Sequence, residues 1–265
     1  MKRRQLIQFI AGLGLAAGLV AAPAFADEQI KIGVTAGPHA EIMEQVKKVI
    51  EKDGVQLKVI EFTDYIQPNA ALSAGDLDAN SYQHQPYLDA QIKDRGYKFI
   101  SVGSTITFPM GVYSKKIKSL NDLKTGARIG VPNDPTNGGR ALLVLQAKGV
   151  IKLKADAGLK ATPLDIVENP KKVKIVELDA AQLPRSLDDF DAAVINGNFA
   201  ESAGLSPTKD AIAVEASTGP YANVIAIRAA DKDKPWVAKL VKAYHSPEVK
   251  KFVLEKYKGS VITSW

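Results

Sequence analysis

The sequence predicts an α/β protein made of two lobes around a cleft. From residue 30 onward, short β-branched runs alternate with longer amphipathic segments, which is the pattern of βα units with largely parallel sheets. Two such units flank an extended stretch over 99–113, and a β-branched segment near Val224 can return the chain to the first unit. We therefore expect a two-lobe clamp whose cleft lies at the strand ends, with a single doubly wound sheet as the alternative.

The first unit begins with a strand over 30–35, which is rich in β-branched residues. Gly37-Pro38 then opens a helix with apolar residues at helical spacing over 42–50, and Gly54 lies just beyond its end. The remaining elements expected of this unit are a strand over 57–62, a short helix over 69–73 and an extended segment over 78–82.

The second unit is predicted to contain a strand over 127–131, a polar loop over 132–140 and an apolar helix over 141–148 that ends before Gly149. Its other elements are a short helix over 119–123 and strands over 173–178 and 192–195. The chain then closes with a strand over 222–227 and helices over 235–244 and 247–257. These elements predict lobe 1 at 27–107, lobe 2 at 108–220 and a return to lobe 1 at 221–265.

The N-terminal segment has the features of a secretory signal. Basic residues at 2–4 precede an apolar run over 9–22, and Ala24-Phe25-Ala26 follows as a small-residue cleavage site. A membrane anchor, the alternative, needs about 20 apolar residues, and this run is shorter. The chain has no cysteine that could accept a lipid. We therefore expect residues 1–26 to be removed and the mature protein to be periplasmic without a lipid anchor; the sequence leaves the export route open.

Acidic and basic side chains are nearly balanced, with 35 Lys+Arg and 29 Asp+Glu in 265 residues. Three of the basic residues lie in the N-terminal segment, and the remaining lysines are scattered rather than interleaved with aromatic residues. A groove for single-stranded nucleic acid needs that interleaving. We therefore expect no nucleic-acid partner.

Motifs of catalysis and metal binding are absent from the sequence. There is no G-x-S-x-G elbow, H-E-x-x-H pair or Walker A loop. The three histidines, His39, His84 and His245, have no pair at i,i+4 spacing, although a metal site assembled from distant segments stays as an alternative. Without cysteine, thiolate ligands and a Cys nucleophile are excluded. We predict a protein that is not an enzyme and that needs no metal or cofactor.

Groups suited to binding are better represented. Residues 134–140 join a strand to a helix, where free backbone N–H groups favour an anion and Arg140 offers a planar donor fork to a carboxylate. The segment 80–87 is dense in aromatic and amide side chains, which suit an apolar pocket with a few fixed polar contacts. Asn196 and Asn223 add amides at strand ends. The alternatives are tight packing at Gly138-Gly139, a solvated arginine, core tyrosines and turn-capping amides.

Five motifs carry a resemblance to a known family. They are KIGVTAGPH over 31–39, FTDYIQPN over 62–69, NSYQHQPYL over 80–88, VPNDPTNGGRAL over 131–142 and AVIN over 193–196. Through them nearly the whole mature chain, from Ile30 to Trp265, resembles the NlpA/MetQ lipoprotein family, the methionine-binding substrate proteins of bacterial ABC importers. Many members carry a lipidated Cys after the signal, where this chain has Ala26-Asp27.

The resemblance implies a type II periplasmic binding protein, in which two hinge strands join the lobes and methionine is enclosed between them. It implies that Arg140 holds the ligand carboxylate and that the amides bond the carboxylate and the ammonium. The amides are Asn137, Asn196 and Asn223, and the walls of the side-chain pocket are Tyr65, Tyr82, His84 and Phe108. The implied partner is the membrane permease of an ABC methionine importer, and we expect a monomer.

Two other functions stay open from the sequence. Another cargo, such as a methionine-containing dipeptide or a different small anion, would use the same kind of cleft. A periplasmic enzyme would need a nucleophile or base constellation that the sequence lacks. The preference for L- or D-methionine cannot be read from the residues.

Overall fold

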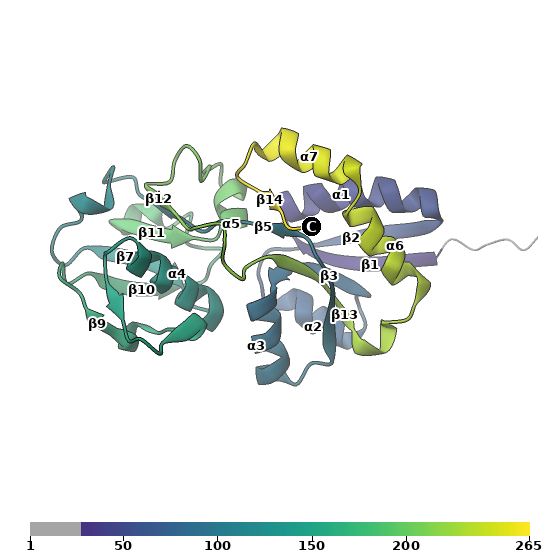
Figure 1. Cartoon of the computed structure of the whole chain (residues 1–265), viewed down its shortest axis with the longest axis horizontal. Coiled ribbons are helices and arrows are strands. Elements are labelled where there is room, and N and C mark those ends of the chain that lie inside the picture. The colour runs from purple at the N-terminus through teal and green to yellow at the C-terminus, as the bar shows by residue number, and fades with distance from the viewer. Residues whose placement is uncertain (1–27) are drawn as a thin grey trace, which may run out of the picture.

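The computed structural model describes residues 28–265, so the predicted signal over 1–26 lies outside the described residues. Two lobes lie side by side, each built on its own five-stranded sheet (Figure 1). This is the predicted two-lobe α/β architecture rather than one doubly wound sheet, and the fold-class prediction is confirmed. Within 28–265, no helix combines the length and the apolar character that crossing a membrane requires.

The sheet of lobe 1 has the strand order β2-β1-β3-β13-β4. Its strands are β1 (Glu28–Thr35), β2 (Val55–Phe62), β3 (Ala79–His84), β4 (Phe99–Ser104) and β13 (Asn223–Arg228). Its helices are α1 (Pro38–Ile50), α2 (Gln67–Ala74), α3 (Gln85–Arg95), α6 (Pro235–Tyr244) and α7 (Pro247–Tyr257). Strand β1 is parallel to β2 and β3, whereas β13 is antiparallel to both β3 and β4.

The sheet of lobe 2 has the strand order β10-β7-β11-β6-β12. Its elements are β6 (Gly111–Tyr113), β7 (Arg128–Pro132), β10 (Lys174–Leu178), β11 (Ala192–Ile195), β12 (Ala213–Val214), α4 (Pro135–Ala147) and α5 (Gly197–Ser202). Strand β6 is antiparallel to β11 and β12. Both sheets are therefore mixed but largely parallel, as expected, because only β13 in lobe 1 and β6 in lobe 2 run against the other four strands of their sheet.

Short pairs and turns complete the chain. The two-stranded pairs are β5 (Ile106–Thr107) with β14 (Ile262–Thr263), and β8 (Lys152–Leu153) with β9 (Ile166–Glu168). The single 3-10 turns are Glu51–Asp53, Leu120–Asp122, Gly158–Lys160, Pro163–Asp165, Leu187–Asp189 and Ala229–Asp231. The helix expected over 119–123 is thus one 3-10 turn, which Ser119 caps by accepting from the backbone N–H of Asn121.

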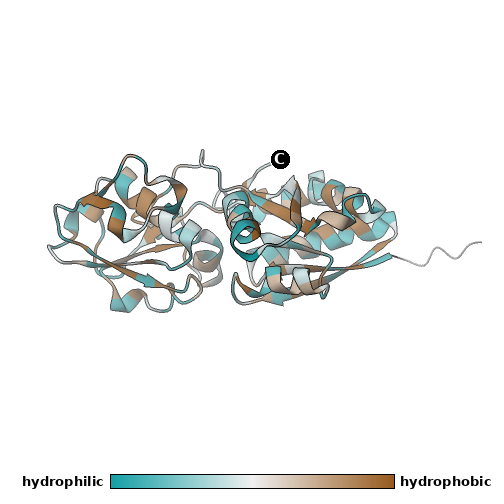
Figure 2. Ribbon diagram, turned by 90° about the horizontal axis from the view of Figure 1, so that it is seen from below, coloured by the Kyte–Doolittle hydropathy of each residue, from teal (hydrophilic) through white to brown (hydrophobic). Residues whose placement is uncertain are grey.

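The core of lobe 1 covers both faces of its sheet. On one face, buried Ile32 and Val34 of β1 pack with Ile42 and Val46 of α1 in the same cluster as apolar residues of α6 and α7. On the other face, Leu72 of α2 and Leu88 of α3 pack with Val224 and Ala226 of β13 in a second cluster. Figure 1 shows these two helical layers, and Figure 2 shows that apolar segments gather inside each lobe while polar segments lie outside. The 3.6-residue period of α1 thus places its apolar stripe on the sheet.

The chain crosses between the lobes at two places that lie next to each other. One crossing runs from β4 through β5 to β6, and the other joins β12 to β13. They are hydrogen-bonded where Glu215 N donates to Met110 O at 2.9 Å and Thr105 N donates to Asn223 O at 2.7 Å. Two adjacent crossings are the usual place for a hinge. The boundaries expected at 107/108 and 220/221 stay a prediction.

Helix α4 starts at Pro135, six residues before the helix expected at 141. Asp134 caps it, because its carboxylate accepts from the backbone N–H of Asn137 at 2.9 Å, and Pro135 occupies the first turn. The glycine pair lies inside this helix, where a Cβ on Gly139 would stand 2.9 Å from Ala161 N and would also meet the carbonyl of Leu159. The glycine therefore lets α4 pack directly on backbone.

We expect Gly139→Ala to destabilise the protein by about 1–3 kcal/mol, because the added methyl overpacks α4 against rigid backbone. Gly54→Ala is the control: its φ is +74° but the space around its Cβ is open, so it should cost roughly 1 kcal/mol from backbone strain alone. Urea unfolding measures both. A Gly139→Ala midpoint equal to wild type would contradict the close approach.

Candidate ligand-binding site

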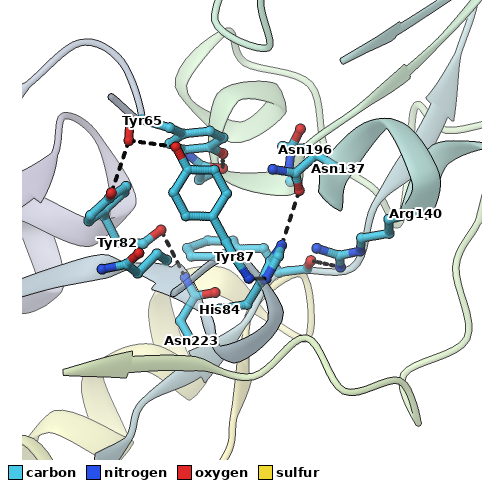
Figure 3. Close-up of a pocket in the computed structure, with 12 residues that line it drawn as sticks. Tyr65, Tyr82, His84, Tyr87, Asn137, Arg140, Asn196 and Asn223 are labelled. Atoms are coloured by element: carbon cyan, nitrogen blue, oxygen red, sulfur yellow. Dashed lines mark hydrogen bonds between the residues drawn. The ribbon is translucent and has the colours of Figure 1, made fainter. Parts of the chain in front are cut away.

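A cavity lies between the lobes at the carboxyl ends of their central strands. Figure 3 shows its lining side chains converging from both lobes. The lining residues are Tyr65, Tyr82, Gln83, His84, Tyr87, Phe108, Asn137, Arg140, Asn196, Gly197, Asn198 and Asn223. All eight residues expected at the site therefore line one cavity, and four further residues, Gln83, Tyr87, Gly197 and Asn198, join them.

Each lobe supplies part of the lining. Tyr65 follows β2, Tyr82 and His84 end β3, and Asn223 begins β13, so these come from lobe 1. Asn137 and Arg140 lie on α4, and Asn196 directly follows β11, so these come from lobe 2. Phe108 lies on the first crossing, between β5 and β6. The cavity exists only when the lobes are together.

Three tyrosines form an uncharged wall at one end of the cavity. The rings of Tyr65, Tyr82 and Tyr87 lie with centroids 6.0 to 6.2 Å apart. The hydroxyls of Tyr82 and Tyr87 both donate to the backbone carbonyl of Tyr65 at 2.9 Å. Burial raises the pKa of all three hydroxyls, so the wall carries no charge at neutral pH. Tyr87 is missing from the expected site although the 80–88 motif contains it.

A hydrogen bond joins the lobes beside this wall. The hydroxyl of Tyr65 donates to Oδ1 of Asn198 at 2.6 Å, from lobe 1 to lobe 2. The Nδ2 of Asn198 is buried and has no partner among residues 28–265. Asn198 was not predicted, although it lies only two residues after the predicted Asn196. The second amide of Asn-Gly-Asn at a strand end was the sequence signal that could have identified it.

His84 is a buried, neutral imidazole. Burial, and then the positive charge of Arg140, lowers the pKa of His84 to about 3. Its Nδ1 accepts from the backbone N–H of Tyr87 at 3.1 Å, so the ring proton is on Nε2. Nε2 faces Oδ1 of Asn137 at 3.2 Å, across the cleft. The ring is therefore both the N-cap of α3 and a contact between the lobes.

Asn137 is bonded by the protein at both ends of its amide. Its Nδ2 donates to Asp134 Oδ2 at 2.8 Å, and its Oδ1 accepts from Asn196 Nδ2 at 2.8 Å as well as facing His84. These contacts turn the Asn196 amide so that its Oδ1 is left buried without a partner in the described part of the chain. The unpaired acceptor that the cavity offers is thus on Asn196 and not on Asn137.

Arg140 is already held by the protein on two of its three nitrogens. Nε donates to Glu215 Oε1 at 2.9 Å, and Nη2 donates to Glu215 Oε2 at 2.5 Å and to the carbonyl of Phe108 at 2.9 Å. The guanidinium carbon lies 4.1 Å from the ring centre of Tyr221. Within the described residues only Nη1 lacks a protein partner, so the expected two-nitrogen fork is reduced to one nitrogen. Neither Glu215 nor Tyr221 was expected at the site.

The N-terminus of α4 does not offer free N–H groups to an anion. The carboxylate of Asp134 already accepts from the backbone of Asn137, from its side chain and from Thr136 Oγ1. Burial raises the pKa of this carboxyl, against the lowering effect of those hydrogen bonds. The interpretation of residues 134–140 as an anion loop is therefore wrong, because the cap fills the place an anion would take. No group of three His, Asp or Glu side chains within 28–265 is arranged to hold a metal.

A family model described as NlpA lipoprotein matches residues 30–265. The chain belongs to the NlpA lipoprotein family. A relative named D-methionine-binding lipoprotein MetQ, from Salmonella typhimurium, is 53% identical over 239 residues, which cover 89% of this chain and 88% of that protein. The resemblance stated from the motifs is confirmed.

Solved structures of similar proteins have the same fold. A nutrient-binding protein from Burkholderia cenocepacia, bound to methionine, is 65% identical with a TM-score of 0.88, covering 89% of this chain and 100% of that one. An ABC transporter periplasmic substrate-binding protein from Coxiella burnetii is 50% identical with a TM-score of 0.86, covering 89% and 100%. The Salmonella, Burkholderia and Coxiella relatives are all described as binding proteins, so the prediction of a binding protein rather than an enzyme is confirmed.

The localisation prediction is corrected by the same findings. The lack of a cysteine led to the expectation of a periplasmic protein without a lipid anchor, but the family and the Salmonella relative are named as lipoproteins. That expectation inferred the absence of a lipid anchor from the absence of a cysteine in the sequence. Membership of a lipoprotein family overturns it.

We expect stability to fall as the pH falls from 7 to 5, because His39 and His84 are buried and neutral with pKa values lowered to about 3. In the unfolded chain each titrates near pH 6.5, so below that pH the unfolded state binds more protons than the folded state. Each histidine therefore contributes stability that is full above pH 6.5 and is lost toward pH 3, about 2 kcal/mol between pH 7 and 5.

Urea unfolding at pH 7 and pH 5 measures this loss. His39→Gln removes one of the two groups and should flatten the dependence by about half. An unfolding free energy that is the same at both pH values, or a His39→Gln slope equal to wild type, would contradict the neutral buried imidazoles.

Proposed function

We propose that this chain binds methionine in the cavity between its lobes and delivers it to the membrane permease of an ABC importer, acting as a monomer. The observation that carries the proposal is the pairing, in one cavity, of unsatisfied amide and guanidinium atoms with an uncharged wall of tyrosines. An amino acid with an apolar side chain is divided in the same way, because its charged backbone groups lie at one end and its uncharged side chain at the other. The methionine bound to the Burkholderia relative supports the cargo, and the description of the Coxiella relative supports the delivery role.

The backbone end of the ligand meets groups of both signs. Nη1 of Arg140 is the cation's remaining donor, and we assign it to the ligand carboxylate. The buried Oδ1 of Asn196 is an acceptor without a partner, and we assign it and Asn223 to the ammonium. Asn137 acts through Asn196, whose amide it turns. Because Glu215 neutralises most of the arginine charge, a zwitterion fits this end better than a free anion.

The side-chain end suits an unbranched thioether. Tyr65, Tyr82 and Tyr87 offer ring edges and faces, and sulfur–aromatic contacts contribute roughly 0.3 to 1.5 kcal/mol each beyond burial. Among the lining residues the only charged side chain is Arg140, which belongs to the backbone end. A charged ligand side chain would therefore be buried without a counter-charge.

Arg140→Met should weaken methionine binding by about 2–5 kcal/mol, because it removes the donor for a carboxylate in a poorly hydrated cavity. It also leaves Glu215 unpaired, so the double variant Arg140→Met/Glu215→Gln separates loss of the ligand contact from the cost of a buried lone carboxylate. Calorimetry measures the methionine affinity of both variants, and both should bind methionine weakly.

The control is Lys152→Met, which removes an exposed lobe 2 cation paired with Glu168 at 2.6 Å, away from the cavity. Its affinity should equal wild type. Methionine binding by Arg140→Met/Glu215→Gln within a few-fold of wild type would overturn the carboxylate assignment.

Ligand selection should follow the uncharged wall. Methionine should stabilise the protein most, and norleucine should bind with modestly reduced affinity because it loses only the sulfur. Methionine sulfoxide should bind less well because its polar oxygen is taken out of water and placed beside the tyrosine rings. Glutamate and lysine should fail. A thermal-shift and calorimetry panel at one pH tests this, with L- and D-methionine and a methionine-containing dipeptide as further arms.

Stronger stabilisation by glutamate or lysine than by methionine would contradict the cargo. Tighter binding of the dipeptide than of either methionine would replace methionine by a peptide while keeping the binding-protein role.

A further inference from the structure

We propose that His39 is a positioning residue that fixes the Asn223 amide with its oxygen toward the cavity, and so determines that this position receives the ligand's ammonium. His39 does not line the cavity and lies behind Asn223, in the first turn of α1. The proposal rests on the proposed function, which it deepens by naming what sets the polarity of one subsite.

The contacts form a chain from the end of β1 to the cavity. Thr35 Oγ1 lies 2.8 Å from His39 Nδ1, and His39 Nε2 lies 2.8 Å from Asn223 Nδ2. Thr35, His39 and Asn223 are 0%, 2% and 6% exposed, so water does not compete for these bonds. The ring also packs on Phe108 with centroids 4.8 Å apart, which restricts its rotation.

The orientation of the Asn223 amide follows from its second contact. The amide atom that faces His39 is also 3.4 Å from the backbone carbonyl of Tyr82, which only accepts (Figure 3). That atom must therefore be the nitrogen, since the oxygen would oppose a second oxygen. The amide oxygen is left on the other side of the group, and Asn223 lines the cavity.

The same argument determines the histidine tautomer. Because Asn223 Nδ2 donates, His39 Nε2 must accept, and the ring proton must be on Nδ1, where Thr35 Oγ1 accepts it. A neutral imidazole has one donor and one acceptor, so the chain works in one direction only. The burial that lowers the pKa of His39 to about 3 keeps it in this neutral form.

Two measurements test the inference. In ¹⁵N-labelled wild type, long-range ¹H–¹⁵N spectra should show His39 as the Nδ1–H tautomer with a bare Nε2. The Nε2–H tautomer would overturn the proposal, because the amide of Asn223 would then be reversed.

Calorimetry with ligands that differ only in the ammonium gives the second test. His39→Leu should weaken methionine binding ten- to a hundred-fold and leave 4-(methylthio)butanoate, which lacks the ammonium, within three-fold of wild type. His39→Gln, which keeps an acceptor near Nε2, should restore methionine binding to within three-fold. Adding His39→Leu to Asn223→Ala should cause no further loss, since one residue acts through the other.

Equal losses for methionine and 4-(methylthio)butanoate would show a merely structural role and overturn the inference. His245→Leu is the matched control, because His245 bonds Ser104 and stacks on Trp265 away from the cavity, and it should bind both ligands as wild type does. If wild type binds no methionine, the proposed function fails by itself, and the His39 tautomer still reports on the positioning role.

Discussion

The Arg140–Glu215 ion pair is the interaction on which the site depends. Arg140 is on α4, Glu215 is on the second crossing, and Glu215 also accepts from Met110 N on the first crossing at 3.1 Å. Arg140 in turn donates to the carbonyl of Phe108. One guanidinium therefore ties the helix of lobe 2 to both segments about which the lobes can rotate. Both side chains are nearly buried, at 4% and 11% exposure, so breaking the pair by removing one partner leaves an uncompensated charge at the hinge.

Fixed hydrogen-bond polarity is what would let a cavity with one free cationic nitrogen recognise the zwitterion that we propose as its ligand. Asp134 orients Asn137, which orients Asn196, and each step is a contact of 2.8 Å. His39 holds Asn223 in the same way from the other lobe. Because His39 and His84 are neutral, neither adds a charge that would oppose an ammonium. The polar atoms that face the cavity are thus oriented by hydrogen bonds within the protein, which pre-organises the site.

The sequence contained much of the fold but not the partners of the site residues. The periodicity of apolar residues was sufficient to predict α1, α6 and α7, whose apolar stripes face a sheet. The family resemblance implied eight residues that do line one cavity. The start of α4 was also readable, since Asp134-Pro135 is an N-cap followed by a first-turn proline. By contrast, Glu215 is 75 residues from Arg140, and His39 is 184 residues from Asn223. No local pattern encodes such pairings, because they arise only when the return strand and the two crossings come together.

The unpaired atoms of the cavity give a physical reason for coupling closure to occupancy. With the lobes together, Asn196 Oδ1 and Asn198 Nδ2 are buried without partners among residues 28–265, and each such atom costs about 1–3 kcal/mol. Against this, the lobes gain few polar contacts across the cleft, of which Tyr65 to Asn198 and His84 to Asn137 are two. A net hydrogen bond contributes about 1 kcal/mol, so the two unpaired atoms offset much of what these two contacts contribute. A ligand ammonium that donates to Asn196 Oδ1 removes that atom's share of the penalty at the moment it is enclosed. Closure therefore favours ligands that carry an ammonium, since a ligand that lacks one leaves that share of the cost in place.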